Sequence, residues 1–176
     1  MENGFIQVYT GDGKGKTTAA LGLALRAAGA GLKTLIIQLM KEGFSYSELT
    51  SLKPLAPMIT VEQYGDDAHV LQKRRPTARE RAAAGRGLER AAEALTGGGF
   101  DIVILDEVCV AVHFGLLTEG DVTVLFNLSR SSGVELLLTG RYCPEAWIER
   151  ADLVTEMREV KHYFQKGVVS RKGIDS

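Results

Sequence analysis

The chain has 176 residues and a formal net charge of −1, and 45% of its residues are hydrophobic and 24% charged. This composition excludes a disordered chain, a fibre and a strongly basic nucleic-acid-binding protein. The length predicts a single domain spanning residues 1–176 with a sizeable core. We expect no membrane span and no signal peptide, because no apolar run approaches about 20 residues and the N-terminus lacks a basic region followed by an apolar one.

Apolar runs predict six strands along the chain. Helical stretches fall between them: Thr18 to Ala30, a long helix starting at Thr77, an apolar stretch around His113, and a helix from Thr118 to about Ser131. This alternation indicates crossover connections and an α/β fold with a mostly parallel sheet of five to six strands and helices on both faces. The predicted strands are Phe5–Tyr9, Thr34–Met40, Met58–Tyr64, Phe100–Leu105, Val134–Leu138 and Leu153–Val160.

Local signals define the long helix. Thr77 and Glu80 have the spacing of a capping box, and Gly97 begins a glycine triplet that ends the helix. Two segments, Lys41 to Pro57 and Gly65 to Pro76, look like long loops. Because both follow strands, we expect both at the carboxyl edge of the parallel sheet, where ligands bind in such folds.

The segment from Thr10 to Thr18 reads T-G-D-G-K-G-K-T-T and lies between the first strand and the first helix. Its glycines allow backbone N–H groups to turn inward as an anion nest, and the helix N-terminus adds partial positive charge. Lys16 can reach phosphates and Thr17 can offer a hydroxyl to Mg²⁺. The loop is a variant, because the strict pattern needs glycine where Thr10 stands. It predicts a P-loop NTPase-like fold and a nucleotide site formed by Gly11, Asp12, Gly13, Lys14, Gly15, Lys16, Thr17 and Thr18, which the family resemblance given below implies is an ATP site.

Acidic and basic residues are expected to complete this site. Asp106 and Glu107 follow the fourth strand, and one or two carboxylates are what Mg²⁺ bound to a triphosphate takes. Arg141 follows the fifth strand and suits phosphate recognition. Arg26, in the first helix, either contacts the nucleotide or lies on the helix surface.

These motifs together resemble the P-loop family of corrinoid (cobalamin) adenosyltransferases. The resemblance rests on residues 11–20, Leu105-Asp106-Glu107, Thr139-Gly140-Arg141 and the tail from Val160-Lys161-His162 to Lys172-Gly173-Ile174-Asp175. It implies transfer of the 5′-deoxyadenosyl group of ATP to cobalt(I) of a corrinoid, with release of tripolyphosphate. It also implies a cytoplasmic homodimer, and we expect a reductase as a partner. It also implies that Arg26 and Arg141 contact ATP and that Thr17 and Glu107 bind Mg²⁺ with support from Asp106.

Two departures from the family are expected to matter. The first strand begins about four residues into the chain, so the N-terminal arm of many members is expected to be absent. The family's aromatic pair after the third strand, which excludes the lower axial ligand of cobalt, is missing between Gly65 and Arg75. We expect His69, Val70 and Leu71 in that segment to face the corrinoid, together with His162 in the tail. His69 is either an axial ligand of cobalt or an ordinary loop histidine.

Other interpretations of the residues stay open. An ATPase or kinase that breaks the β–γ bond would use the same loop, and so would a nucleotide-binding module that regulates a partner without catalysis. The catalytic residues expected for adenosyl transfer are Lys16, Thr17 and Glu107. The basic cluster formed by Lys73, Arg74, Arg75, Arg79 and Arg81 either meets a ligand or partner or is a solvated face.

Overall fold

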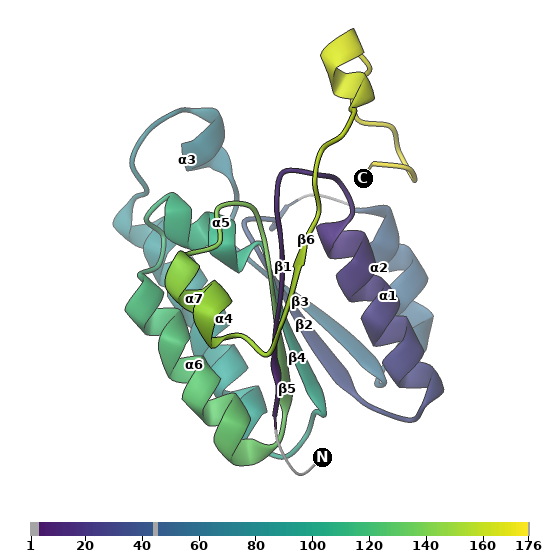
Figure 1. The fold of residues 1–176 in the computed structure, drawn as a ribbon, viewed down its shortest axis with the longest axis vertical. Helices are drawn as coiled ribbons and strands as arrows, with labels where there is room; N and C mark the ends of the chain where they lie inside the picture. The colour runs from purple at the N-terminus through teal and green to yellow at the C-terminus, as the bar shows by residue number, and fades with distance from the viewer. Residues whose placement is uncertain (1–3, 44–45, 176) are drawn as a thin grey trace.

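A computed structural model describes residues 4–43 and 46–175, which form a six-stranded parallel sheet with helices on both faces (Figure 1). The strand order is β3-β2-β4-β5-β1-β6, and every neighbouring pair is parallel. This confirms the predicted α/β class. The strands are β1 (Ile6–Thr10), β2 (Thr34–Leu39), β3 (Ile59–Tyr64), β4 (Ile102–Asp106), β5 (Glu135–Thr139) and β6 (Leu153–Glu156).

The helices divide into two layers. Helices α1 (Lys16–Gly29) and α2 (Ser47–Leu52) cover one face, and α4 (Ala78–Thr96), α5 (Val108–His113), α6 (Glu119–Ser132) and α7 (Glu145–Arg150) cover the other (Figure 1). Every residue of β2, β4 and β5 is buried, as expected for central strands covered on both sides. On the α1 face, Ala20, Ala24 and Ala27 are buried, and their small side chains let the helix lie close to the sheet.

Capping boxes begin the two longest helices of the second layer. Thr77 caps α4 with Glu80, as predicted, and Thr118 caps α6 with Asp121. In each box the hydroxyl accepts a backbone N–H and the carboxylate reaches back to the cap, so two otherwise unpaired donors are satisfied. Gly97 follows α4 directly, which confirms the predicted end of that helix.

Several expected loops and ends differ from the sequence prediction. The segment from Lys41 to Pro57 contains α2 and a 3₁₀ turn, η1 (Lys53–Leu55), and the segment from Gly65 to Pro76 contains the short helix α3 (Ala68–Leu71). Helix α7 was not predicted, and β6 ends at Glu156 rather than Val160. The missed helices have six residues or fewer, too short for a 3.6-residue period to be visible.

The carboxyl ends of the strands meet at one edge of the sheet. The loop after β1, the ends of β2 and β4, and the C-terminal segment with its 3₁₀ turn η2 (Tyr163–Lys166) gather there, at the top of Figure 1. None of the helices in residues 4–43 and 46–175 combines the length and apolar character needed to cross a bilayer.

Candidate functional site

The glycines of the loop after β1 are required by close packing as well as by backbone shape. Gly11 has a φ of +92°, and a Cβ there would lie 2.4 Å from the carbonyl oxygen of Met157; a Cβ on Gly13 would lie 2.7 Å from the same atom. The N–H of Gly13 donates to that carbonyl at 2.7 Å. The chain after β6 therefore holds the loop, and the Gly13 N–H, expected to join an anion nest, is committed to it.

Two cations converge on this loop. Lys16 is buried, and its Nζ donates to the carbonyl oxygens of Gly11 at 2.6 Å and Gly13 at 2.7 Å. Burial, aided by the nearby Arg141 guanidinium, lowers the pKa of Lys16. Arg141 donates to the carbonyl oxygen of Asp12 at 3.1 Å. The loop thus presents one buried ammonium and one exposed guanidinium, and these two positive charges favour an anionic ligand.

Asp106 is the centre of a buried polar network. Its Oδ1 accepts hydrogen bonds from Thr17 Oγ1 at 2.9 Å and Thr139 Oγ1 at 2.7 Å. Its Oδ2 accepts from Lys41 Nζ at 2.7 Å and Gln38 Nε2 at 3.3 Å. Asp106 is only 1% exposed, so these four donors replace the water that a buried carboxylate loses. The network joins the ends of β2, β4 and β5 to the start of α1.

Lys41 carries the charge that balances Asp106. The two form a 2.7 Å ion pair, and the Lys41 ammonium also lies 3.4 Å from Thr17 Oγ1 and 5.2 Å from the centre of the Tyr46 ring. Burial opposes the charged form of Lys41, but the attraction of Asp106 outweighs it and raises the pKa of Lys41 above its ordinary value. The sequence analysis did not assign this lysine, because nothing in the predicted strand–loop context links it to Asp106.

Glu107 follows Asp106 with a left-handed backbone, at a φ of +65°, which costs a residue other than glycine roughly 1–3 kcal/mol. Its N–H donates to Thr139 Oγ1 at 3.0 Å, and the turn points its side chain into the space above the loop. Burial, followed by the neighbouring Asp106 charge, raises the pKa of Glu107. Within the described residues the Glu107 side chain has no hydrogen-bond partner, so it is available to a ligand.

The donor set fits a hard divalent cation. Thr17, Asp106 and Glu107 offer oxygen atoms, the type of ligand that Mg²⁺ prefers. The positively charged Lys41 ammonium already lies near two of these groups, Thr17 and Asp106. The described residues contain no cluster of three or more histidine, cysteine or acidic side chains able to hold a metal alone. A metal here would therefore need further oxygens from its ligand, as Mg²⁺ bound to a triphosphate has.

Two cavities of about 650 and 700 Å³ border the loop. The first has an apolar wall formed by Val70, Val110, Phe114 and Tyr142, and the tail residues His162 and Phe164 also line it. The second lies between α1 and α2 and is lined by Leu21, Lys41 and Tyr46 among others. The residues common to both cavities are Lys14, Thr17, Thr18, Glu107 and Asp175.

The structure brings only some of the remaining predicted residues to these cavities. Val70 and His162 line the first cavity, and their contact with a corrinoid stays a prediction. Leu71 lines neither cavity and is 68% exposed. His69 is 1% exposed and packs edge-on against Phe114, with both ring nitrogens unpaired among the described residues. Arg26 is exposed in the last turn of α1, roughly 14 Å along the helix from Thr17, so the structure does not bring it to the phosphate loop.

Aromatic side chains reach the first cavity from segments where we did not expect them. The stretch from Gly65 to Arg75 has none, but Phe114, just after α5, and Tyr142, after β5, lie on the same wall as Val70. His113 stacks on Tyr142 with 4.0 Å between ring centroids. The aromatic wall is therefore built by tertiary contacts rather than by one motif.

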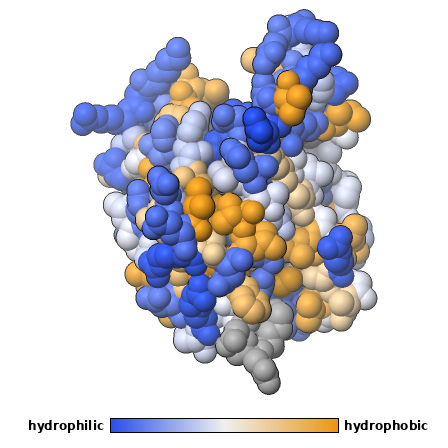
Figure 2. All heavy atoms as spheres, viewed as in Figure 1, coloured by the Kyte–Doolittle hydropathy of each residue, from blue (hydrophilic) through white to orange (hydrophobic). Residues whose placement is uncertain are grey.

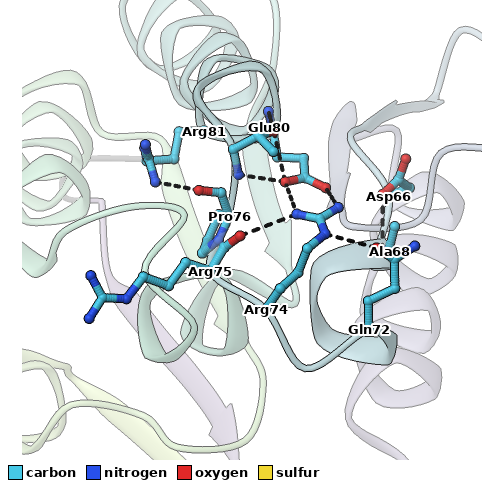
Figure 3. A network of polar contacts seen from close by, with 9 residues as sticks. Asp66, Ala68, Gln72, Arg74, Arg75, Pro76, Glu80 and Arg81 are labelled. Atoms are coloured by element: carbon cyan, nitrogen blue, oxygen red, sulfur yellow. Dashed lines mark hydrogen bonds and ion pairs between the residues drawn. The ribbon is translucent and has the colours of Figure 1, made fainter.

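An ion-pair clamp shapes the segment that carries Val70 (Figure 3). Arg74 makes two parallel bonds to Glu80, at 2.6 and 2.8 Å, and its Nε donates to Gln72 at 2.8 Å. Glu80 also accepts the N–H of Thr77 at 2.6 Å. Arg74, with help from Thr77, holds the pKa of Glu80 well below its usual range. This part of the basic cluster is therefore structural: it ties the 65–76 segment to the start of α4.

The C-terminal tail lies across the phosphate loop. Lys14 Nζ donates to the carbonyl oxygen of Ile174 at 2.6 Å and pairs with Asp175, which also contacts Tyr163 and Arg171. Tail residues consequently line both cavities. The sequence analysis used the tail only as part of the family resemblance and did not predict its contact with Lys14.

The fold is a parallel sheet with a glycine-rich loop between β1 and α1, a lysine and threonine at the helix start, and an acidic pair at the end of β4. This arrangement is consistent with the P-loop NTPase-like class of α/β proteins. The family model of the ATP:corrinoid adenosyltransferases (BtuR/CobO/CobP) matches residues 2–176, and the chain belongs to this family.

Named relatives agree with this assignment. The corrinoid adenosyltransferase of Escherichia coli strain K12 is 36% identical over 174 residues, covering 99% of this chain and 86% of that protein. The corrinoid adenosyltransferase CobA of Salmonella typhimurium is 35% identical with the same coverage. The corrinoid adenosyltransferase of Pseudomonas aeruginosa is 31% identical and covers 99% of this chain and 84% of that protein.

Proposed function

We propose that this protein transfers the 5′-deoxyadenosyl group of ATP to cobalt(I) of a corrinoid and releases tripolyphosphate, in the synthesis or salvage of adenosylcobalamin. Family membership supports the reaction class. The observation that carries the proposal is the convergence of Lys16, Thr17, Glu107 and Arg141 on one edge, beside a cavity with an apolar, aromatic wall. Such a wall suits a large amphipathic macrocycle, and the charged loop suits a triphosphate.

The chemistry requires alignment more than acid–base catalysis. Cobalt(I) is itself the nucleophile, so it attacks the ribose C5′ while the bond from C5′ to the triphosphate oxygen breaks in line. The leaving tripolyphosphate gains negative charge, and Lys14, Lys16 and Arg141 are placed to stabilise it. Bound Mg²⁺ would neutralise part of that charge. The protein's task is to hold the phosphates and to exclude water from the reacting centre.

The predicted residues that lie at the phosphate loop each have a proposed role. The loop from Gly11 to Thr18 holds the triphosphate, with Lys16 as the principal contact and Arg141 beside it. Thr17, Asp106 and Glu107 hold Mg²⁺, with Glu107 the freest of the three. Asp106 also positions Thr17 through their 2.9 Å hydrogen bond.

The corrinoid is proposed to lie against the wall of the first cavity. Val70, Phe114 and Tyr142 would face the macrocycle, and His162 would meet it from the tail. His69, buried behind Phe114, would support that wall rather than coordinate cobalt from its present position. Phe114 then supplies the aromatic surface that the 65–75 segment lacks.

Product analysis tests the proposed function directly. Incubation with MgATP and a chemically reduced corrinoid should convert the corrinoid spectrum to that of the adenosylated form, with one tripolyphosphate released per corrinoid. ADP or orthophosphate as the product would instead support the kinase or ATPase alternative. No turnover, with retained nucleotide binding, would support a regulatory module.

Glu107→Gln should weaken Mg²⁺ binding by at least about tenfold, because it keeps the shape and removes the charge. The pKa of Glu107 is raised above its ordinary value of 4.5. The wild-type affinity for Mg²⁺ should therefore fall as the pH drops through that raised pKa, because the carboxylate becomes protonated. The variant should lack this pH dependence. Isothermal titration with Mg²⁺ and a non-hydrolysable ATP analogue across pH measures both effects.

A stability measurement supplies the matching control. Because the folded protein binds the Glu107 proton more tightly than the unfolded chain, metal-free wild type should lose stability as the pH rises from about 4.5 through the raised pKa. Glu107→Gln should not show this loss. An unchanged Mg²⁺ titration together with an unchanged stability profile would contradict the assigned role.

Arg74→Ala should raise the KM for the corrinoid several-fold and leave the KM for ATP unchanged, because the clamp shapes the wall that carries Val70 while lying away from the phosphate loop. Steady-state kinetics with each substrate varied in turn measures the two constants. Arg79→Ala is the matched control, since the exposed Arg79 side chain makes no hydrogen bond or ion pair within the described residues. Equal effects of the two variants would argue for a general charge effect.

The chain is further proposed to act as one domain, in the cytoplasm, as a homodimer that receives reduced corrinoid from a reductase. An apolar patch in the middle of one face supports the homodimer, at the place where β6 and α7 run (Figure 2). Ile148, Leu153 and Val154 are exposed there, and β6 is an edge strand. Sedimentation equilibrium of the wild type and of a Leu153→Lys variant tests this.

A further inference from the structure

We propose that Lys41 is the resident counter-cation of the metal site: its ammonium holds Asp106 and Thr17 until metal-bound ATP enters, and then turns to the triphosphate. This inference rests on the proposed function of the site, and it gives a role to a residue that neither the motifs nor the family comparison assigns.

The position of the Lys41 ammonium supports the first part of the proposal, in which it holds Asp106 and Thr17. Lys41 Nζ lies 2.7 Å from Asp106 Oδ2 and 3.4 Å from Thr17 Oγ1, the same two groups that are suited to a divalent cation. The side chains of Lys41 and Asp106 are only 12% and 1% exposed. A metal ion bound by Asp106 and Thr17 would compete with the Lys41 ammonium for the same oxygen atoms.

Electrostatics explains why a cation must be present there. A buried carboxylate without a positive partner is costly, and its two neutral threonine donors and one glutamine donor do not cancel its charge. Glu107, the next residue, adds a second negative charge at the same edge. Lys41 is the only ammonium or guanidinium group within the described residues that forms an ion pair with Asp106.

The surroundings of Lys41 support the second part of the proposal, in which the ammonium turns to the triphosphate. Its side chain lines the second cavity together with Thr17, Thr18 and Glu107, so the triphosphate-binding loop borders the same space. The long unbranched stem of lysine can turn without moving the backbone. When a divalent cation neutralises Asp106, the displaced ammonium can approach the phosphate oxygens from the second cavity, whereas Arg141 lines only the first.

Metal binding without nucleotide tests the competition. Electron paramagnetic resonance of Mn²⁺ added to the full chain should show at least about tenfold tighter binding to Lys41→Gln than to wild type, because the competing charge is gone. Lys41→Arg keeps the charge and should stay within about threefold of wild type. Lys14→Gln is the matched control: it removes a cation that also lines the second cavity but pairs with Asp175, and should leave Mn²⁺ affinity nearly unchanged. Equal or weaker binding by Lys41→Gln, or equal tightening by Lys14→Gln, would overturn the proposal.

Thermal unfolding gives a second measurement that does not depend on activity. Lys41→Met leaves Asp106 buried without its cation, so its Tm in EDTA should fall by about 6 °C or more, and Mg²⁺ should restore at least half of that loss. Wild type should respond little to Mg²⁺ alone. A Tm loss that Mg²⁺ does not reverse would contradict the exchange. If Lys41→Met does not fold in EDTA, folding on addition of Mg²⁺ supports the proposal and failure to fold opposes it.

Kinetics tests the contact with the triphosphate. Lys41→Gln should raise the KM for ATP by about fivefold or more while the KM for the corrinoid stays unchanged. An unchanged KM for ATP would remove the second part of the proposal. The Mn²⁺ and Tm measurements need no corrinoid, so they remain interpretable if the wild type forms no adenosylated product, the outcome that would reject the proposed function itself.

Discussion

Lys16→Ala should lower kcat/KM for adenosyl transfer about 100-fold, or roughly 2.7 kcal/mol of transition-state stabilisation. Lys16 is buried at the mouth of the phosphate loop, where it donates to the carbonyl oxygens of Gly11 and Gly13. A triphosphate offers stronger acceptors than those carbonyls, and it gains negative charge as the bond to C5′ breaks. Burial lowers the pKa of Lys16, and a bound anion would oppose that shift by stabilising the charged ammonium.

Single-turnover kinetics with prereduced corrinoid and saturating MgATP separates this effect from corrinoid reduction. Lys33→Ala is a suitable control, because Lys33 is an exposed lysine just before β2, at the opposite edge of the sheet. Its kinetics should match wild type. Wild-type kinetics in Lys16→Ala would mean that the loop does not hold the triphosphate as proposed.

Asp106→Asn should both abolish most activity and destabilise the fold. An asparagine can still accept from Thr17 and Thr139 through its oxygen, but its amide group would face two donors, Lys41 and Gln38. Removing one charge of a buried ion pair leaves the Lys41 ammonium without compensation, which costs about 3–5 kcal/mol. For a chain of this size, a loss of 3 kcal/mol lowers Tm by about 6–12 °C, which differential scanning calorimetry measures.

Thr139→Val provides the graded comparison for Asp106→Asn. It removes one donor to Asp106 and the acceptor for the Glu107 N–H, without changing any charge. A loss of about 1–3 kcal/mol is expected, smaller than for Asp106→Asn. A Tm loss for Asp106→Asn no larger than for Thr139→Val would show that the Lys41–Asp106 pair contributes little to the fold.

Features set by local sequence were predictable. The phosphate loop depends on glycines, a lysine and threonines that are consecutive in the chain, and the strand before it and helix after it formed as expected. The capping box of Thr77 and Glu80 spans one helical turn. The all-buried strands β2, β4 and β5 appeared as continuous apolar runs. In each case the physical cause acts between residues a few positions apart.

Features set by the lateral order of strands were not predictable in the same way. Gln38 and Asp106 are register partners in β2 and β4, and Thr139 ends the neighbouring strand β5, so the Asp106 network exists only because these strands are adjacent. The same holds for Lys41, which follows β2. Periodicity reports which residues are buried but carries no information on which strand lies beside which.

The sequence by itself determined the chemistry of the loop, the acidic pair after β4 and the α/β class. Tertiary structure decided that Asp106 is held by Lys41, that Phe114 joins Val70 on one cavity wall, and that Met157 packs on Gly11. The distance of Arg26 from the loop is a local matter, because helix geometry carries a residue in the last turn of α1 about two and a half turns away from Thr17. The difference follows from separation along the sequence. Backbone shape and capping depend on residues a few positions apart, whereas contacts across a sheet depend on how the chain crosses over between strands.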